Sequence, residues 1–159
     1  MRRAALCLAL LVAACGYQAG LDLRDEGVRR VAVRVVGNET FRQRLEIPLT
    51  RELQEALVVH SNVVPASVAE ADAVLEVDIA DVRNRTLVQG AQVPIREGAL
   101  EFALDARLVA TDGGRVLRDR RILERAEFRV PVGENLDSAT REAVRDLARK
   151  IVLSLEADF

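Results

Sequence analysis

The chain has 159 residues, of which 50% are hydrophobic and 30% charged, and its formal net charge at pH 7 is −2. This length suits a single domain, and this composition is too apolar for a disordered chain. With one histidine, two cysteines and no overall basic charge, the composition argues against a metalloenzyme, a disulfide-stabilised scaffold and a nucleic-acid-binding protein.

The N-terminal residues have the pattern of a secretion signal. Arg2 and Arg3 precede an apolar stretch over residues 4–14. This stretch is shorter than the roughly 20 residues that a helix needs to cross a bilayer. It matches the core of a secretory signal peptide, so residues 1–14 are expected to be removed.

The end of this stretch is Leu11-Val12-Ala13-Ala14-Cys15-Gly16. It resembles the bacterial lipobox, in which signal peptidase II cuts before the cysteine and the cysteine is lipid-modified. The resemblance predicts a lipid anchor on Cys15 and, because Gly16 rather than an aspartate follows, sorting to the outer membrane. The alternative is an ordinary signal peptide that leaves Cys15 as a free thiol. Once residues 1–14 are removed, Cys15 is the one remaining cysteine, so no disulfide within the chain is expected.

The mature chain is predicted to begin with a lipid-anchored tether over residues 15–30, followed by one domain over residues 31–159. Alternating valines predict a strand over residues 31–36, which ends at a break over residues 37–40. Leucines at steps of four predict a helix over residues 47–59, with Pro48 in the first turn, where proline is tolerated. Residues 61–72 are predicted to be a connector.

Three strands are predicted next. Residues 73–85 alternate, with Leu75, Val77 and Ile79 on the buried face, and residues 86–98 are predicted to form a long loop. The clearest strand covers residues 100–108, and the turn at residues 112–114 leads to a returning strand over residues 116–130. The imperfect alternation of that last strand predicts a β-bulge.

A final helix with an apolar stripe is predicted at the C-terminal end, capped by Asp137 or Ser138. The element order is therefore β-α-β-β-β-α. Two amphipathic helices can cover one face of a sheet. We therefore expect an α+β two-layer sandwich: a four-stranded, mostly antiparallel sheet covered on one face by two helices. The other face is expected to meet solvent or a polar partner, since it carries these charged residues: Glu76, Asp78, Glu101, Asp105 and Arg107.

Several short segments, in this order, resemble the lipopolysaccharide-assembly lipoprotein family, called LptE-like. They are Cys15-Gly16-Tyr17, Asn38-Glu39-Thr40, Leu45-Glu46, Leu49-Thr50-Arg51-Glu52-Leu53, Ala71-Asp72-Ala73-Val74-Leu75 and Leu147-Ala148 through Ile151, with Phe159 at the end. The resemblance spans the mature chain. It implies a non-enzymatic lipoprotein on the periplasmic face of the outer membrane, which plugs an LptD-type β-barrel, helps that barrel assemble and binds lipopolysaccharide. No cofactor or metal is implied.

Arginines gather around the hairpin strands, and they are the candidate ligands of lipopolysaccharide phosphates. The candidates are Arg83, Arg85, Arg118, Arg120 and Arg121. Guanidinium groups bind phosphate through paired hydrogen bonds. The competing hypothesis is a solvated strand face on which carboxylates balance the arginines. His60 has no nucleophile motif beside it, and no catalytic residue is predicted.

A second function class stays open at the level of sequence. The strand that opens at Val31-Ala32-Val33 and runs into Asn38-Glu39-Thr40 also resembles lipoproteins of the penicillin-binding-protein-activator and curli-secretion types. Those relatives would make the chain a synthase regulator or a secretion-pore subunit.

Overall fold

The computed structural model describes residues 21–41, 44–88, 97–129 and 135–156. The predicted signal peptide, Cys15 and most of the predicted loop over residues 86–98 lie outside the described residues. The elements in chain order are η1 (Arg24–Glu26), β1 (Arg30–Val33), β2 (Gly37–Asn38), α2 (Glu46–His60), β3 (Val64–Pro65), β4 (Ala73–Val88), β5 (Glu97–Ala110), β6 (Val116–Arg129) and α3 (Leu136–Ser154).

The described strands form one six-stranded sheet in the order β3-β1-β4-β5-β6, and β2 pairs with β4. The long strands β4, β5 and β6 are antiparallel, whereas the short strands pair in parallel with their neighbours. The mostly antiparallel α+β fold is confirmed, but the prediction of four strands is wrong. β2 and β3 have two residues each, too few to show an alternating pattern.

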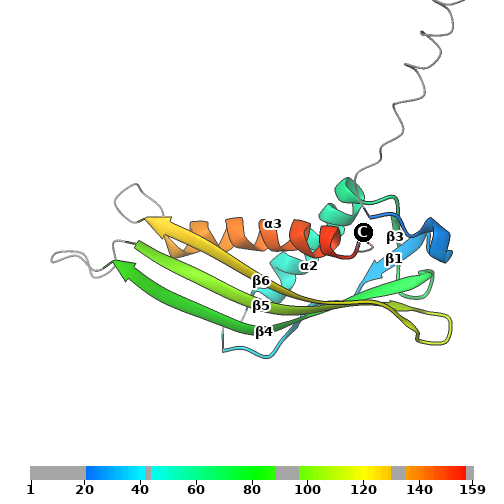
Figure 1. Ribbon diagram of the computed structural model, residues 1–159, viewed down its shortest axis with the longest axis horizontal. Coiled ribbons are helices and arrows are strands. Elements are labelled where there is room, and N and C mark those ends of the chain that lie inside the picture. Colours follow the sequence, from blue (N-terminus) through cyan, green and yellow to red (C-terminus); the bar gives the residue numbers. More distant parts are fainter. Residues whose placement is uncertain (1–20, 42–43, 89–96, 130–134, 157–159) are drawn as a thin grey trace, which may run out of the picture.

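Both helices lie on the same side of the sheet, as Figure 1 shows, and this confirms the two-layer arrangement. Each helix buries one stripe against the sheet, in the way expected of an amphipathic surface helix. From α2 the stripe is Leu49, Leu53, Ala56 and Leu57, and from α3 it includes Val144, Leu147, Ala148 and Ile151. Opposite them lie the alternate residues of β5: Leu100, Phe102, Leu104, Ala106 and Leu108.

The helix ends agree with the predictions to different degrees. α2 begins one residue before the predicted start and ends one after the predicted end, with Pro48 in its first turn. The cap predicted for α3 is wrong, because its N-cap is Asn135. The Asn135 side chain accepts the backbone N–H of Ser138 at 2.9 Å, and the Ser138 hydroxyl accepts the N–H of Asn135 at 2.9 Å. This reciprocal capping box satisfies backbone groups that the helix itself leaves unpaired.

Residues 21–30 differ from the predicted tether, because they pack as part of the domain. Leu21, Leu23 and Val28 are buried in the main core. These three side chains occur at irregular intervals in a mixed-charge segment, so the sequence pattern did not indicate burial.

The carboxylate of Asp72, just before β4, forms hydrogen bonds with Arg29 and Arg30 at the end of this segment. One oxygen accepts the backbone N–H groups of Arg29 and Arg30 at 3.0 and 2.8 Å, and the other accepts the Arg30 guanidinium at 3.0 Å. These hydrogen bonds, with the Arg30 side chain first among them, lower the pKa of Asp72 to about 2.

β-bulges set which side chains face the helices. The register of β4 against β5 shifts between Ile79 and Asp81 and again between Thr86 and Val88, and the register of β6 shifts between Val116 and Arg118. Each extra residue exchanges the two faces of its strand from that point onward. The predicted bulge in β6 is therefore present, and β4 contains two register shifts that were not predicted.

Candidate functional site

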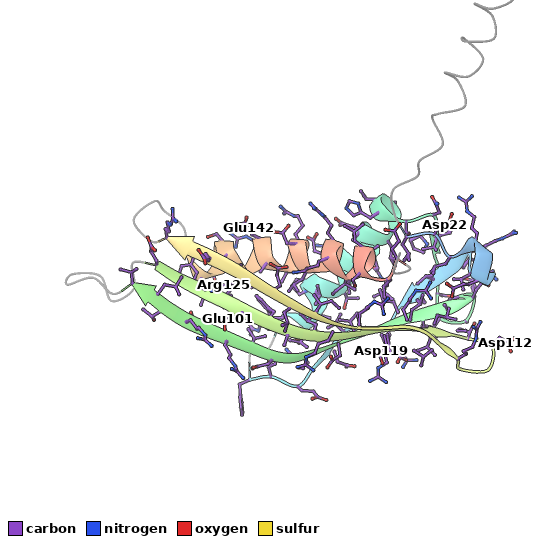
Figure 2. All side chains as sticks on the ribbon, in the orientation of Figure 1. Asp22, Glu101, Asp112, Asp119, Arg125 and Glu142 are labelled. Carbon is purple, nitrogen blue, oxygen red and sulfur yellow. The ribbon has the colours of Figure 1, made fainter. Side chains whose placement is uncertain are left out.

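The sheet face opposite the helices, called the outer face below, carries a ladder of charged side chains. The register places Arg83, Glu101 and Arg125 in one row across β4, β5 and β6. A second row across the same three strands consists of Glu76, Arg107 and Asp119. Figure 2 shows Glu101 and Arg125 toward one end of the sheet, whereas Asp112 and Asp22 lie at the opposite end. The outer face is thus polar along the sheet, as the sequence predicted.

A shallow hollow of about 240 Å³ lies on the outer face where this ladder is interrupted. Its centre is apolar, because Ala103 of β5 and Leu123 of β6 are opposite each other in the register. Leu123 is 64% exposed. The charged side chains at the hollow are Asp81, Arg83, Glu101 and Arg121. Ala103 was not predicted as a site residue, although strand alternation alone places it outward between Glu101 and Asp105.

The arginines that line the hollow are exposed, and each forms an ion pair with a carboxylate. Arg83 binds Asp81 at 2.6 Å, and Arg121 binds Asp105 at 3.3 Å. Arg85, next along β4, binds Glu101 at 2.8 Å. Exposed ion pairs of this kind contribute only about 0–1 kcal/mol. A phosphate with good geometry can therefore replace a carboxylate at these guanidinium groups with little loss of stability.

Arg118 and Arg120 lie on the opposite side of the sheet from this hollow, beneath the end of α3. Arg118 donates to the carbonyl of Leu155 at 3.0 Å, and Arg120 donates to that of Ser154 at 3.1 Å. Arg118 also forms an ion pair with Glu26 of η1 and is only 15% exposed. α3 has no basic residue in its own last turn, so these two arginines supply the positive charge that a helix C-terminus favours.

The five predicted phosphate ligands therefore do not form one site. Arg83, Arg85 and Arg121 gather on the outer face, whereas Arg118 and Arg120 hold the end of α3. The hairpin turn at residues 112–114 is as predicted, with Gly113 and Gly114 at φ of 73° and 66°. His60 lies at the end of α2, where its carbonyl accepts the N–H of Leu21 at 3.1 Å.

Two further features bear on function. Within the described ranges, neither helix is apolar and long enough to cross a membrane. The same residues hold no group of three or more His, Cys, Asp or Glu side chains placed to bind a metal ion.

Solved structures with low sequence identity to the chain share this fold, among them the following three. A hypothetical protein from Chlamydia trachomatis is 13% identical with a TM-score of 0.58, covering 80% of this chain and 95% of that one. An uncharacterized lipoprotein B from Nitrosomonas europaea is 16% identical with a TM-score of 0.55, covering 82% and 83%. PelC from Paraburkholderia phytofirmans, a dodecamer, is 17% identical with a TM-score of 0.54, covering 89% and 96%. At these identities the similarity establishes the fold alone.

No curated protein sequence matches the chain significantly. The sequence model of the LptE family, described as lipopolysaccharide assembly, matches residues 28–155. This match runs from just before β1 to the residue that follows α3, and so includes both helices and every strand of the described sheet. The chain therefore belongs to the LptE family of lipopolysaccharide-assembly proteins.

Proposed function

We propose that the chain is an outer-membrane lipoprotein, anchored through acylated Cys15 on the periplasmic face, that plugs an LptD-type β-barrel and helps it assemble. In this role it contacts lipopolysaccharide on its way to the cell surface and catalyses no reaction. The observation that carries the proposal is the family match over residues 28–155. The lipobox before Cys15 supports the anchor.

The outer face is the surface that we propose for contact with the barrel and with lipopolysaccharide. Arginine and carboxylate side chains on this face are mostly paired with each other, for example Arg125 with Glu127 at 2.9 Å and Arg129 with Glu97 at 3.6 Å. When no partner is bound, such a mixed-charge face remains in contact with water. On binding, its side chains can exchange these ion pairs for ion pairs with the polar lining of a partner. Complementary charges of this kind set specificity more than affinity.

Within this face, we propose the hollow at Arg83 and Arg121 as the contact for lipopolysaccharide phosphate, with Arg85 beside it. Two guanidinium groups next to the apolar pair Ala103 and Leu123 suit an anionic group attached to a partly apolar molecule. Arg118 and Arg120 are left out of this site, because their guanidinium groups hold the end of α3.

The phosphate contact is tested by the affinity of the purified protein for lipopolysaccharide. The double substitution Arg83→Ala and Arg121→Ala removes both guanidinium groups of the hollow and should weaken binding at least about tenfold, or about 1.4 kcal/mol. Arg107→Ala is the matched control, since Arg107 is an exposed arginine of the outer face that does not line the hollow. Equal affinities of the double variant and the wild type would reject this site.

The assembly role is tested by depleting the chain from its native cell. The proposal predicts that folded, heat-modifiable barrel and surface lipopolysaccharide decrease together, because the barrel lacks its assembly partner. A Cys15→Ser variant should restore neither. Normal levels of folded barrel after depletion would contradict the assembly role.

A ring of identical copies is the second candidate, and it corresponds to the secretion-pore alternative. The specific observation in its favour is the fold that the chain shares with PelC, which is described as a dodecamer. The number of copies in the native complex separates the two candidates, because a plug is present once per barrel.

A further inference from the structure

An exposed apolar patch lies at the edge of the domain formed by the end of α2, by β3 and by the turn after it. It consists of Val58, Val64, Pro65 and Val68, called the valine patch below. The three valines are 62%, 60% and 50% exposed. In a chain in which 30% of residues are charged, residues 64–69 contain no charged side chain. Val58, Pro65, Ala66 and Ser67 line one open hollow, together with the charged residues Arg51, Glu55 and Glu70.

This patch adjoins the point at which the chain enters the domain. The N–H of Leu21 donates to the carbonyl of His60 at 3.1 Å, and the carbonyl of Leu21 accepts the N–H of Asn62 at 3.1 Å. Leu21 is thereby fixed between the end of α2 and the start of β3, which are at the same end of the molecule in Figure 1.

The distance from this point to the proposed anchor is short. Five residues, 16–20, separate Cys15 from Leu21, and the six residue steps between the two span at most about 20 Å when fully extended. An acylated Cys15 therefore keeps the end of the domain that carries the valine patch close to the bilayer surface, whatever path residues 16–20 take.

We propose that the valine patch contacts the lipid bilayer and orients the domain on it. The proposal rests on the proposed lipid anchor at Cys15. Exposed apolar side chains favour the interfacial region of the bilayer, where they leave water, while the charged side chains around the hollow remain among the polar headgroups. The area of a few valines is small, so the contact depends on the anchor, which raises the local concentration of lipid around the patch.

The structure disfavours another strand as the occupant of this edge. β3 has only two residues, and Pro65 has no N–H to donate to a neighbouring strand. Short edge strands that contain proline are typical of edges that do not pair with a second chain.

The test uses the full-length acylated protein in vesicles of phosphatidylethanolamine and phosphatidylglycerol, with or without brominated acyl chains. Because acylation blocks Cys15, an engineered cysteine takes an environment-sensitive fluorophore at one position. The positions are Val64→Cys and Val68→Cys, with Ile47→Cys as control, since Ile47 is 65% exposed in the first turn of α2, at the opposite end of that helix from Val58. Flotation of the protein with the vesicles reports the anchor independently of the fluorescence.

The proposal predicts that brominated lipid quenches most of the fluorescence at Val64→Cys and Val68→Cys and leaves the fluorescence at Ile47→Cys unchanged. Protein that floats but shows no quenching at the two patch positions overturns the patch while the anchor stands. A blue shift of the fluorescence without quenching means that a second copy of the chain or another protein covers the valine patch. This result also overturns the proposal. Wild-type protein that does not float overturns the anchor, and the patch proposal fails with it.

Discussion

The Asp72 carboxylate connects the start of β1 to the residue before β4. It accepts two backbone N–H groups and the Arg30 guanidinium, and its pKa is about 2. The ordinary value is about 3.9. The folded state stabilises the ionised carboxylate more than the unfolded state does. This contribution to the free energy of unfolding is therefore fully present above about pH 4 and is lost as the pH falls toward 2.

Asp72→Asn should therefore lower the thermal unfolding midpoint at pH 7 and reduce its dependence on pH between 4 and 2. The substitution keeps the size of the side chain but removes the negative charge that the N–H groups and Arg30 bind. Asp112→Asn, at the exposed hairpin turn, is the control and should follow the wild type. Parallel midpoint curves for Asp72→Asn and the wild type between pH 4 and 2 would show that this carboxylate does not act as described.

Arg118 and Arg121 are three residues apart on β6 but have different roles. Arg118 is 15% exposed and binds Glu26 and the carbonyl of Leu155, whereas Arg121 is 61% exposed and pairs with Asp105. Arg118→Ala should lower the free energy of unfolding by about 1–3 kcal/mol, because it leaves part-buried acceptors without a donor. Arg121→Ala should change it by less than about 1 kcal/mol. Urea unfolding measures both, and equal effects would contradict these assignments.

At the scale of elements, the docking of α3 on the sheet depends on one face of the helix. Leu147 is 1% exposed against the core, and Leu153 on the same helix is 37% exposed. Leu147→Ala should lower the free energy of unfolding by about 2–5 kcal/mol, the usual range for a buried leucine. Leu153→Ala should lower it by about 0.5 kcal/mol or less. A loss at Leu153 as large as that at Leu147 would mean that the helix packs in a different rotation.

The same elements show how far the sequence predicts the fold. α2 and the core of β5 were predicted closely, because each repeats its apolar residues over many positions. β2, β3 and the buried leucines of residues 21–28 were not, since two-residue strands and isolated apolar side chains have no period to detect. Their positions depend on tertiary pairing, such as that of Gly37 with Asp78.

The candidate site was predicted only in part, and the bulges explain why. Arg83 and Arg85 have odd numbers, like the buried Leu75, Val77 and Ile79, so uninterrupted alternation would place them under the helices. The bulge at Ala80 turns them to the outer face instead. In β6, Arg118 and Arg120 share their face with the buried Ile122. A cluster of arginines along two strands therefore divides between two faces of the sheet.

At the scale of the whole molecule, the point of chain entry and the hollow are separated along the sheet. The chain enters beside β3 and the start of β4, and the hollow begins at Asp81, eight residues along β4 from Ala73. At about 3.3 Å per residue, this separation is about 26 Å. A lipid anchor at Cys15 would therefore hold one end of the domain at the membrane, with the proposed phosphate contact about 26 Å away along the sheet.

The most direct test of this account is the composition of the native complex. The acylated protein is extracted from its own outer membrane in mild detergent, and mass spectrometry of the intact assembly gives the identity and copy number of every component. The expected result is one copy of this chain bound to one large β-barrel. A ring that contains only this chain, or a complex with a cell-wall synthase, would contradict it.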